Sequence, residues 1–242
     1  MGVQELKQEA IKLYETHFGS DTSSDDKICS MAPGRVNLIG EHVDYTGGFV
    51  FPIAIDYATV IYGSFVNNEA GDKGQSVMEI VTSSEEGNDE VVKFSLVPSE
   101  IKPFDHSEDS AWANYVMGVV LEYIDPLLSK SEGSLIVKAA IVGDVPLGGG
   151  LSSSASLEVS TATFLEGYIA KGESKSVSEE ELKQIAVDRA IKCRHSSNTF
   201  CGVPCGIMDQ FVTSAGMAGC ALLIDCQDNT FIPVKMGAPS QE

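Results

Sequence analysis

The chain has 242 residues, 43% of them hydrophobic and 21% charged, so it can bury a sizeable core without disulfide or metal staples. A formal net charge of −19 argues against nucleic acid and anionic membranes as main partners, because both would repel the chain. Its six cysteines include no C-x-x-C pair, and no run of about 18 apolar residues occurs, so the composition predicts neither a zinc site nor a membrane span. We expect a cytoplasmic protein and a monomer.

Residues 1–27 are expected to form a helix followed by a polar link. The apolar residues that set the helical rhythm are Val3, Leu6, Ala10, Leu13 and Phe18. The rhythm ends at Gly19 and no apolar core follows basic residues, which favours a surface helix over a signal peptide. Residues 28–242 contain no repeat and no linker that would divide them, so we expect one further domain there.

Strands and turns dominate the next part of the chain. Residues 49–66 are rich in β-branched and aromatic side chains, which predicts two strands that are buried on both faces. Polar stretches at 66–75 and 82–89 predict turns, and a further strand is expected at 91–98. Large residues then repeat with helical spacing over 110–124, which predicts a helix.

The second half of the chain mixes strands with helices. Alternating apolar residues over 134–146 predict a strand, and a helix is expected at 157–170. Ser178 and Glu181 form a capping box, so another helix should begin there. The remaining expected elements are a loop with a short helix at 201–216 and strands at 220–226 and 230–234. The fold class is therefore α+β.

Four polar residues stand out near the start of the domain. Within residues 31–55, MAPGRVNLIGEHVDYTGGFVFPIAI, the chain places Arg35, Glu41, His42 and Asp44 among apolar residues and glycines. Either these charges cap a turn, or they form a polar site that grips a small molecule.

Residues 146–156, PLGGGLSSSAS, lie between a predicted strand and a predicted helix. Glycines let the backbone turn sharply, and the serines fall in the first helical turn, where backbone N–H groups lack partners. This pattern is typical of a loop that binds anions. A flexible connection that ends in a serine N-cap could have a similar sequence. It contains neither G-K-[ST] nor G-x-G-x-x-G, so a phosphate bound here would need a divalent cation for positive charge.

Asp209 lies just past a Cys-Gly turn, flanked by apolar residues. An aspartate at a helix start is most often an N-cap. A partly buried carboxylate stays ionised beside a cation, and Arg35 is the only arginine near the first polar cluster. An Asp–Arg pair beside a phosphate could orient a hydroxyl, accept its proton and offset charge on the moving phosphoryl group.

Together, three segments resemble the galactokinases of the GHMP small-molecule kinase superfamily. They are the galactose-binding signature at 34–48, the ATP loop at 146–156 and the catalytic-aspartate segment at 205–211. The first is specific, since other GHMP kinases share the ATP loop but not the E-H-x-D residues. The resemblance implies an N-terminal domain of the ribosomal protein S5 domain 2-like type, a mixed sheet with helices packed on one face.

The resemblance also implies transfer of the ATP γ-phosphoryl group to the C1 hydroxyl of α-D-galactose. Arg35 would stabilise the transition state, and Asp209 would act as base or anchor for the attacking hydroxyl. The other implied residues are Glu41, His42 and Asp44 for the sugar, Gly148, Gly150, Ser152 and Ser153 for the nucleotide phosphates, and Ser154 for Mg²⁺. Arg35 and Asp209 are expected to converge beside the serine-lined turn. Trp112 and Tyr115 could lie near the adenine of ATP or pack in the hydrophobic core, and their helical spacing fits both positions equally well.

Two departures from the family favour impaired chemistry. Galactokinases carry a metal-ligand glutamate twelve residues before the catalytic aspartate, where this chain has Ser197. They also continue into a C-terminal domain, with a third glycine-rich motif and a sugar-contacting tyrosine, that we expect to be absent here. One alternative is therefore a galactose- and ATP-binding sensor with little activity, although the chain keeps the S-S-A stretch at 153–155. A third reading is an N-acetylgalactosamine kinase.

Overall fold

The computed structural model describes residues 1–20, 27–68, 74–83, 89–172 and 176–237. The link predicted after the first helix and parts of two predicted turns fall outside these residues. Within the described part of the chain, no helix is long and apolar enough to cross a membrane.

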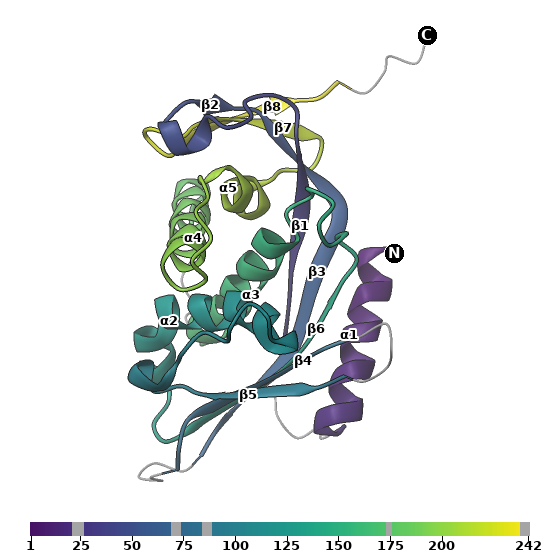
Figure 1. Ribbon diagram of the computed structural model, residues 1–242, viewed down its shortest axis with the longest axis vertical. Coiled ribbons are helices and arrows are strands. Elements are labelled where there is room, and N and C mark those ends of the chain that lie inside the picture. The colour runs from purple at the N-terminus through teal and green to yellow at the C-terminus, as the bar shows by residue number, and fades with distance from the viewer. Residues whose placement is uncertain (21–26, 69–73, 84–88, 173–175, 238–242) are drawn as a thin grey trace.

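One mixed eight-stranded sheet organises the described residues, in the order β2-β7-β3-β6-β4-β5, with β1 paired to β3 and β8 paired to β7 (Figure 1). The strands are β1 Lys27–Asn37, β2 Phe49–Val50, β3 Pro52–Asn67, β4 Val77–Thr82, β5 Val91–Ser95, β6 Leu135–Gly143, β7 Cys220–Asp225 and β8 Thr230–Lys235. Only β4 and β6 run parallel; the other pairs are antiparallel. The two strands predicted at 49–66 are present, and the long β3 joins the two ends of the sheet.

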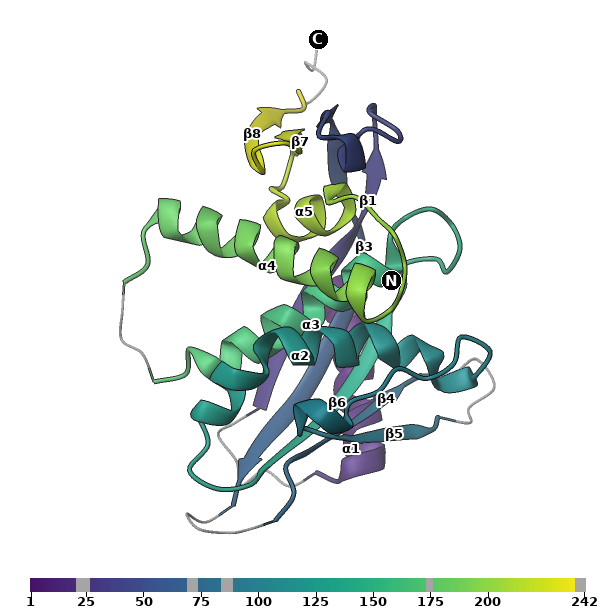
Figure 2. The same ribbon diagram turned by 60° about the vertical axis from the view of Figure 1, so that its left-hand side comes forward.

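Helices cover both faces of the sheet, in unequal numbers (Figures 1 and 2). The helices of the described residues are α1 Val3–Phe18, α2 Ala113–Ser129, α3 Ser153–Ile169, α4 Glu179–Thr199 and α5 Met208–Ala215. The four later helices lie on the face predicted to carry them, whereas α1 packs on the opposite face. Alternation along β3 explains both layers, because Ile61 and Phe65 enter the core under α2 and α3, and Ala58 and Val60 pack against α1. The α+β class is confirmed, with α1 as an added outer layer.

The start of α4 and the end of α1 follow the local sequence closely, whereas α3 begins four residues before the predicted position 157. Ser178 Oγ accepts a hydrogen bond from the Glu181 backbone N–H at 3.2 Å, and Glu181 Oε2 accepts one from Ser178 N–H at 2.8 Å. This capping box begins α4 where it was predicted. Gly19, at φ +85°, ends α1 as predicted.

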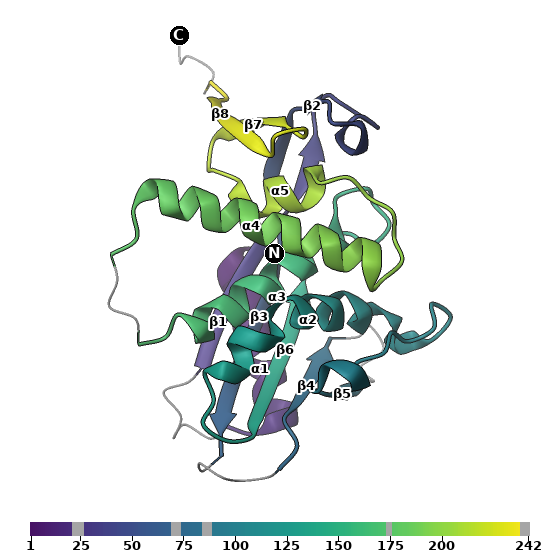
Figure 3. The same cartoon turned by 90° about the vertical axis from the view of Figure 1, so that its left-hand side faces the viewer.

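The short helix α5 occupies the junction on which the site depends. It packs between α4 and the hairpin of β7 and β8, and Figure 3 shows it lying across the upper end of the helical layer. Its apolar residues share a small core with β2 and β7, formed around Val50, Phe211, Leu222 and Ile224. The first turn of α5 is therefore carried to the place where β1 meets the glycine-serine loop.

Candidate functional site

An ion pair joins the beginning and the end of the chain. Arg35 of β1 donates from Nε to Asp209 Oδ1 at 2.8 Å and from Nη2 to Oδ2 at 2.6 Å, although 174 residues separate them. The two side chains are 13% and 31% exposed, so the pair is partly shielded from solvent. Ile207 occupies the N-cap position of α5, so Asp209 lies in the first turn and is not the N-cap.

The glycine-serine loop is fastened to this pair by three further hydrogen bonds. Arg35 donates from Nη1 to the Gly150 carbonyl at 2.6 Å and from its backbone N–H to the Leu151 carbonyl at 3.1 Å. Ser152, in the left-handed region at φ +61°, donates from Oγ to Asp209 Oδ2 at 2.5 Å. The loop, the arginine and the aspartate therefore form one rigid unit.

Gly34 explains how the loop comes so close to the strand. The register of β1 against β3 shifts between Pro33 and Arg35, and a Cβ built on Gly34 would lie 2.7 Å from the Leu151 carbonyl oxygen. A side chain at this position would push the loop away from β1, so the close approach requires glycine.

Ser152 was predicted to help hold the nucleotide phosphates. Its hydroxyl is buried and donates to Asp209, so only its backbone N–H is left for a phosphate. Three donors of the described residues therefore reach the Asp209 carboxylate, which has about four acceptor positions in all. One acceptor position is left for a hydroxyl group that approaches from the exposed side.

The rest of the loop leads to a second opening. Gly148 and Gly150 adopt positive φ angles of +68° and +69°, and Ser153 and Ser154 lie half-buried at the start of α3. A cavity of about 280 Å³ beside them is lined by Trp112 and Ser153, together with Thr59, Thr82, Ser83, Ile141, Gly143, Val145, Leu147 and Leu157. Helix N-termini favour anions, so this cavity suits the phosphate end of a nucleotide.

The signature loop reaches the same region through Asp44. Asp44 Oδ2 accepts the Met208 backbone N–H at 3.3 Å, which places this carboxylate over the first turn of α5. A Cβ on Gly206 would overlap the Asp44 carboxylate, so the two segments touch only because residue 206 is glycine. Asp44 and Asp209 are thereby held at one helix end.

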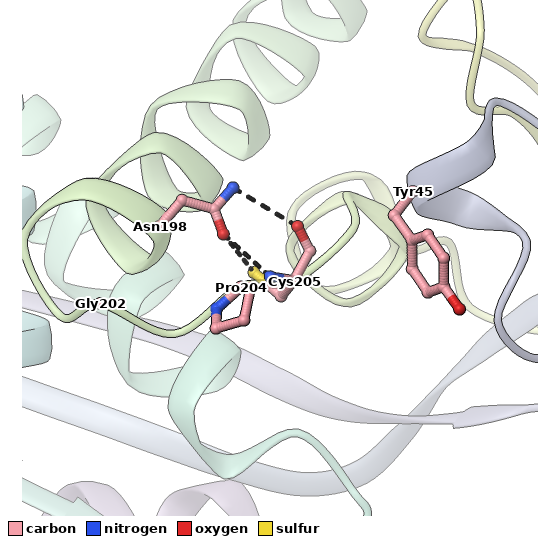
Figure 4. Close-up of a pocket in the computed structure, with 5 residues that line it drawn as sticks. All are labelled: Tyr45, Asn198, Gly202, Pro204 and Cys205. Atoms are coloured by element: carbon pink, nitrogen blue, oxygen red, sulfur yellow. Dashed lines mark hydrogen bonds between the residues drawn. The ribbon is translucent and has the colours of Figure 1, made fainter.

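Glu41 and His42 lie further out on the same loop. Both are exposed; Glu41 accepts a hydrogen bond from Asn37 Nδ2 at 2.8 Å, and His42 Nδ1 lies 3.3 Å from the Tyr45 hydroxyl. Tyr45 also borders a cavity of about 630 Å³, opposite Asn198, Gly202, Pro204 and Cys205 (Figure 4). The signature loop therefore forms one wall of an opening whose other wall is the segment leading into α5.

Ser197 lies in a buried polar cluster behind Asp209. It donates a short hydrogen bond to Glu158 Oε1, and Gln210 Nε2 donates to Glu158 Oε2 at 3.0 Å. Glu158 is completely buried, which raises its pKa to about 7 against the opposing effect of these two hydrogen bonds. The hydroxyl of Ser197 is thus committed to a buried acid.

Glu158 and Gln210 were not singled out from the sequence. A glutamate within an apolar helix, LEVSTATF, is the only signal that could have drawn attention to Glu158. Which helices its carboxylate faces depends on packing that one sequence does not reveal.

Two family models match this chain. The galactokinase galactose-binding signature matches residues 12–65, and the N-terminal domain of GHMP kinases matches residues 114–217. The first range contains the loop that carries Asp44, and the second contains the glycine-serine loop and Asp209.

Curated relatives and solved structures agree with these models. A galactokinase of Homo sapiens is 39% identical over 236 residues, which cover 96% of this chain and 52% of the relative. A galactokinase of Chloroflexus aurantiacus is 34% identical over 234 residues, which cover 94% of this chain and 50% of the relative. The crystal structure of Lactococcus lactis galactokinase complexed with galactose superposes with a TM-score of 0.70 at 26% identity, covering 96% of this chain and 52% of that one. The Methanococcus jannaschii mevalonate kinase shares the fold, with a TM-score of 0.56 at 21% identity. The chain spans about half the length of the curated relatives it matches.

Proposed function

Because this chain belongs to the GHMP kinase family and matches its galactokinases, we propose that it transfers the γ-phosphoryl group of ATP to the C1 hydroxyl of α-D-galactose. The single observation that carries the proposal is the Arg35–Asp209 pair, fastened to the glycine-serine loop. That arrangement supports the proposal because a hydroxyl acceptor and a fixed positive charge lie next to the start of α3, where a phosphate would bind.

The sugar would bind between the signature loop and the start of α5. Asp44 and Asp209 are held at that helix end, and the exposed side chains of Glu41 and His42 line the approach. A sugar epimer that left one of these polar groups unpaired would bind more weakly, which would make the site selective for one hexose. The structural relative that was solved with galactose supports this choice of sugar.

Phosphoryl transfer needs positioning and charge more than covalent chemistry. The open acceptor position on Asp209 would take the hydrogen of the C1 hydroxyl and point its oxygen at the γ-phosphorus. Arg35 already spans Asp209 and the Gly150 carbonyl, so its charge is in place before the substrates arrive. Preorganised charge of this kind typically contributes about 10²–10³ in turnover.

The nucleotide would enter through the cavity lined by Ser153 and Trp112, with its phosphates at the start of α3. The described residues contain no cluster of three His, Cys, Asp or Glu side chains able to hold a metal ion. They fit Mg²⁺ only as a companion of the nucleotide, with the Ser154 hydroxyl as a ligand beside phosphate oxygens and water. When bound, Mg²⁺ would neutralise phosphate charge during transfer.

A catalytically weak sensor is the second candidate, because Ser197 replaces an acid and donates its hydroxyl to Glu158. Two measurements test these readings. In thermal-shift measurements, galactose should raise Tm more than N-acetylgalactosamine or glucose does, because a ligand that binds only the folded state raises Tm. Coupled ADP release should then depend on galactose; galactose binding without ADP release would favour the sensor, and no shift with any sugar would refute both.

A further inference from the structure

We propose that Glu158 is a positioning residue that fixes the orientation of α5, and with it the Asp209 carboxylate. In this arrangement Ser197 serves as a hydrogen-bond partner of Glu158 and not as a metal ligand. The effect on turnover rests on the proposed function, whereas the effect on α5 does not.

Complete burial makes the contacts of Glu158 decisive. The residue lies in the middle of α3 at 0% exposure, where a carboxylate without partners would be strongly disfavoured. Its two oxygens accept from Ser197 of α4 and from Gln210 of α5. One carboxylate therefore joins three helices, and each of its oxygens is committed to a different neighbouring helix.

The link to α5 reaches the residue next to Asp209. Gln210 is 3% exposed and follows Asp209 directly in the first turn of a helix of eight residues. A helix this short has little stability of its own, so its rotation is set by what its side chains contact. Asp209 in turn must keep two bonds to Arg35 at 2.6 and 2.8 Å, and a site of this kind tolerates displacements well below 1 Å.

Glu158 is badly placed to act on a substrate or a metal ion itself. Both of its oxygens already accept hydrogen bonds, and none of its surface is exposed. A role through Gln210 is the one that its contacts allow.

The unpaired oxygen of Gln210 supplies a sharp test. Gln210 Oε1 is buried and has no hydrogen-bond partner among the residues that the structure describes, while its Nε2 donates to Glu158. In Glu158→Gln, the new amide oxygen can still accept a hydrogen bond from Ser197. The new amide nitrogen can donate to Gln210 Oε1 once the Gln210 amide rotates so that its oxygen and nitrogen exchange places. Glu158→Ala can replace neither bond. The conservative variant should therefore rescue what alanine loses.

Glu166 provides a matched control on the same helix. It is a partly buried carboxylate of α3 that forms a two-pronged ion pair with Arg189 of α4, at 2.8 and 2.5 Å. Glu166→Gln weakens a comparable link between α3 and α4. It leaves in place both partners of the Glu158–Gln210 bond, and both partners of the 3.2 Å bond from Arg189 Nη1 to Ser214 near the end of α5.

The experiment measures amide hydrogen exchange over residues 208–215 in the whole chain, followed by steady-state kinetics. We expect Glu158→Ala to speed exchange of this segment about tenfold or more, with Glu158→Gln and Glu166→Gln within about threefold of the parent chain. Turnover should fall about tenfold in Glu158→Ala with KM for ATP nearly unchanged, and recover in Glu158→Gln. If Glu158→Ala does not fold, Gln210→Met is expected to give the same loosening, because it removes the link to α5, together with the 3.8 Å contact from Gln210 Nε2 to Cys205 Sγ, and keeps the Ser197–Glu158 bond.

Unchanged exchange in Glu158→Ala, or equal loosening in Glu166→Gln, would overturn the proposal. So would a loss of turnover in Glu158→Gln as large as that in Glu158→Ala. If the parent chain releases no ADP, the proposed kinase function fails, but the exchange measurement still decides whether Glu158 orders α5.

Discussion

Replacing Arg35 by lysine tests the site with its charge preserved. The guanidinium of Arg35 makes three side-chain hydrogen bonds, two to Asp209 and one to the Gly150 carbonyl. A lysine ammonium can reach one carboxylate oxygen but cannot present a planar fork to both. Arg35→Lys therefore removes the two-pronged hydrogen bonding to Asp209 while keeping a positive charge at the same position of β1.

The expected losses follow from those contacts. Two charge-assisted hydrogen bonds disappear, each worth about 1.5 kcal/mol at the lower end of the usual range, so unfolding should become about 2 to 3 kcal/mol easier. The lower end applies because Asp209 is 31% exposed and water replaces part of what is lost. Turnover should fall about 10²–10³-fold, since the Asp209 carboxylate loses its fixed direction.

Arg189→Lys is the control for this substitution. Arg189 pairs with Glu166 through Nε and Nη2 and donates from Nη1 to Ser214, at exposures of 15% and 23% for the pair. We expect urea unfolding to show a similar loss for both variants, whereas coupled ADP release falls only in Arg35→Lys. Equal turnover in the two variants would refute the claim that the Arg35 fork serves the reaction.

Three further predictions test the neighbouring residues. Asp209→Ala should abolish phosphorylation but spare ATP binding, measured by calorimetry; unchanged turnover would remove Asp209 from the mechanism. Ser197→Glu places a second carboxylate against Glu158, so Tm should fall, and Mg²⁺ should restore neither Tm nor turnover; a gain in both with Mg²⁺ would show a metal ligand at this position and contradict the role given to Ser197. The raised pKa of Glu158, about 7 against 4.5 in the unfolded chain, means that the folded state binds the extra proton between these values. The Glu158 contribution to stability is therefore present at low pH and lost as pH rises from about 4.5 to 7, by about 3 kcal/mol, and urea unfolding of Glu158→Gln should lack this decline.

The local elements could be predicted from sequence because their signals are local. The capping box at Ser178 gave the start of α4, and the alternation over 134–146 gave β6, Leu135–Gly143. The surface helix α1 was predicted, but the face of the sheet that it covers was not, since an amphipathic helix does not reveal which face it will cover.

The site divides in the same way. The need of a partly buried carboxylate for a cation suggested the Arg35–Asp209 pair, and the family resemblance favoured it as well, but nothing in the spacing of residues 174 positions apart shows how they meet. The turn of Ser152 toward Asp209 depends on its left-handed backbone, and the partners of Glu158 depend on how three helices pack. Neither feature has a signature in a single sequence.

The most direct measurement follows the phosphorus atom itself. When ATP, Mg²⁺ and α-D-galactose are mixed with the chain, ³¹P NMR should show a new sugar phosphate at C1 that forms as ATP is converted to ADP, and the signal should be missing with Asp209→Ala. ATP consumption without a galactose phosphate, or phosphorylation at another hydroxyl, would contradict the placement of the C1 oxygen between Asp209 and the γ-phosphorus.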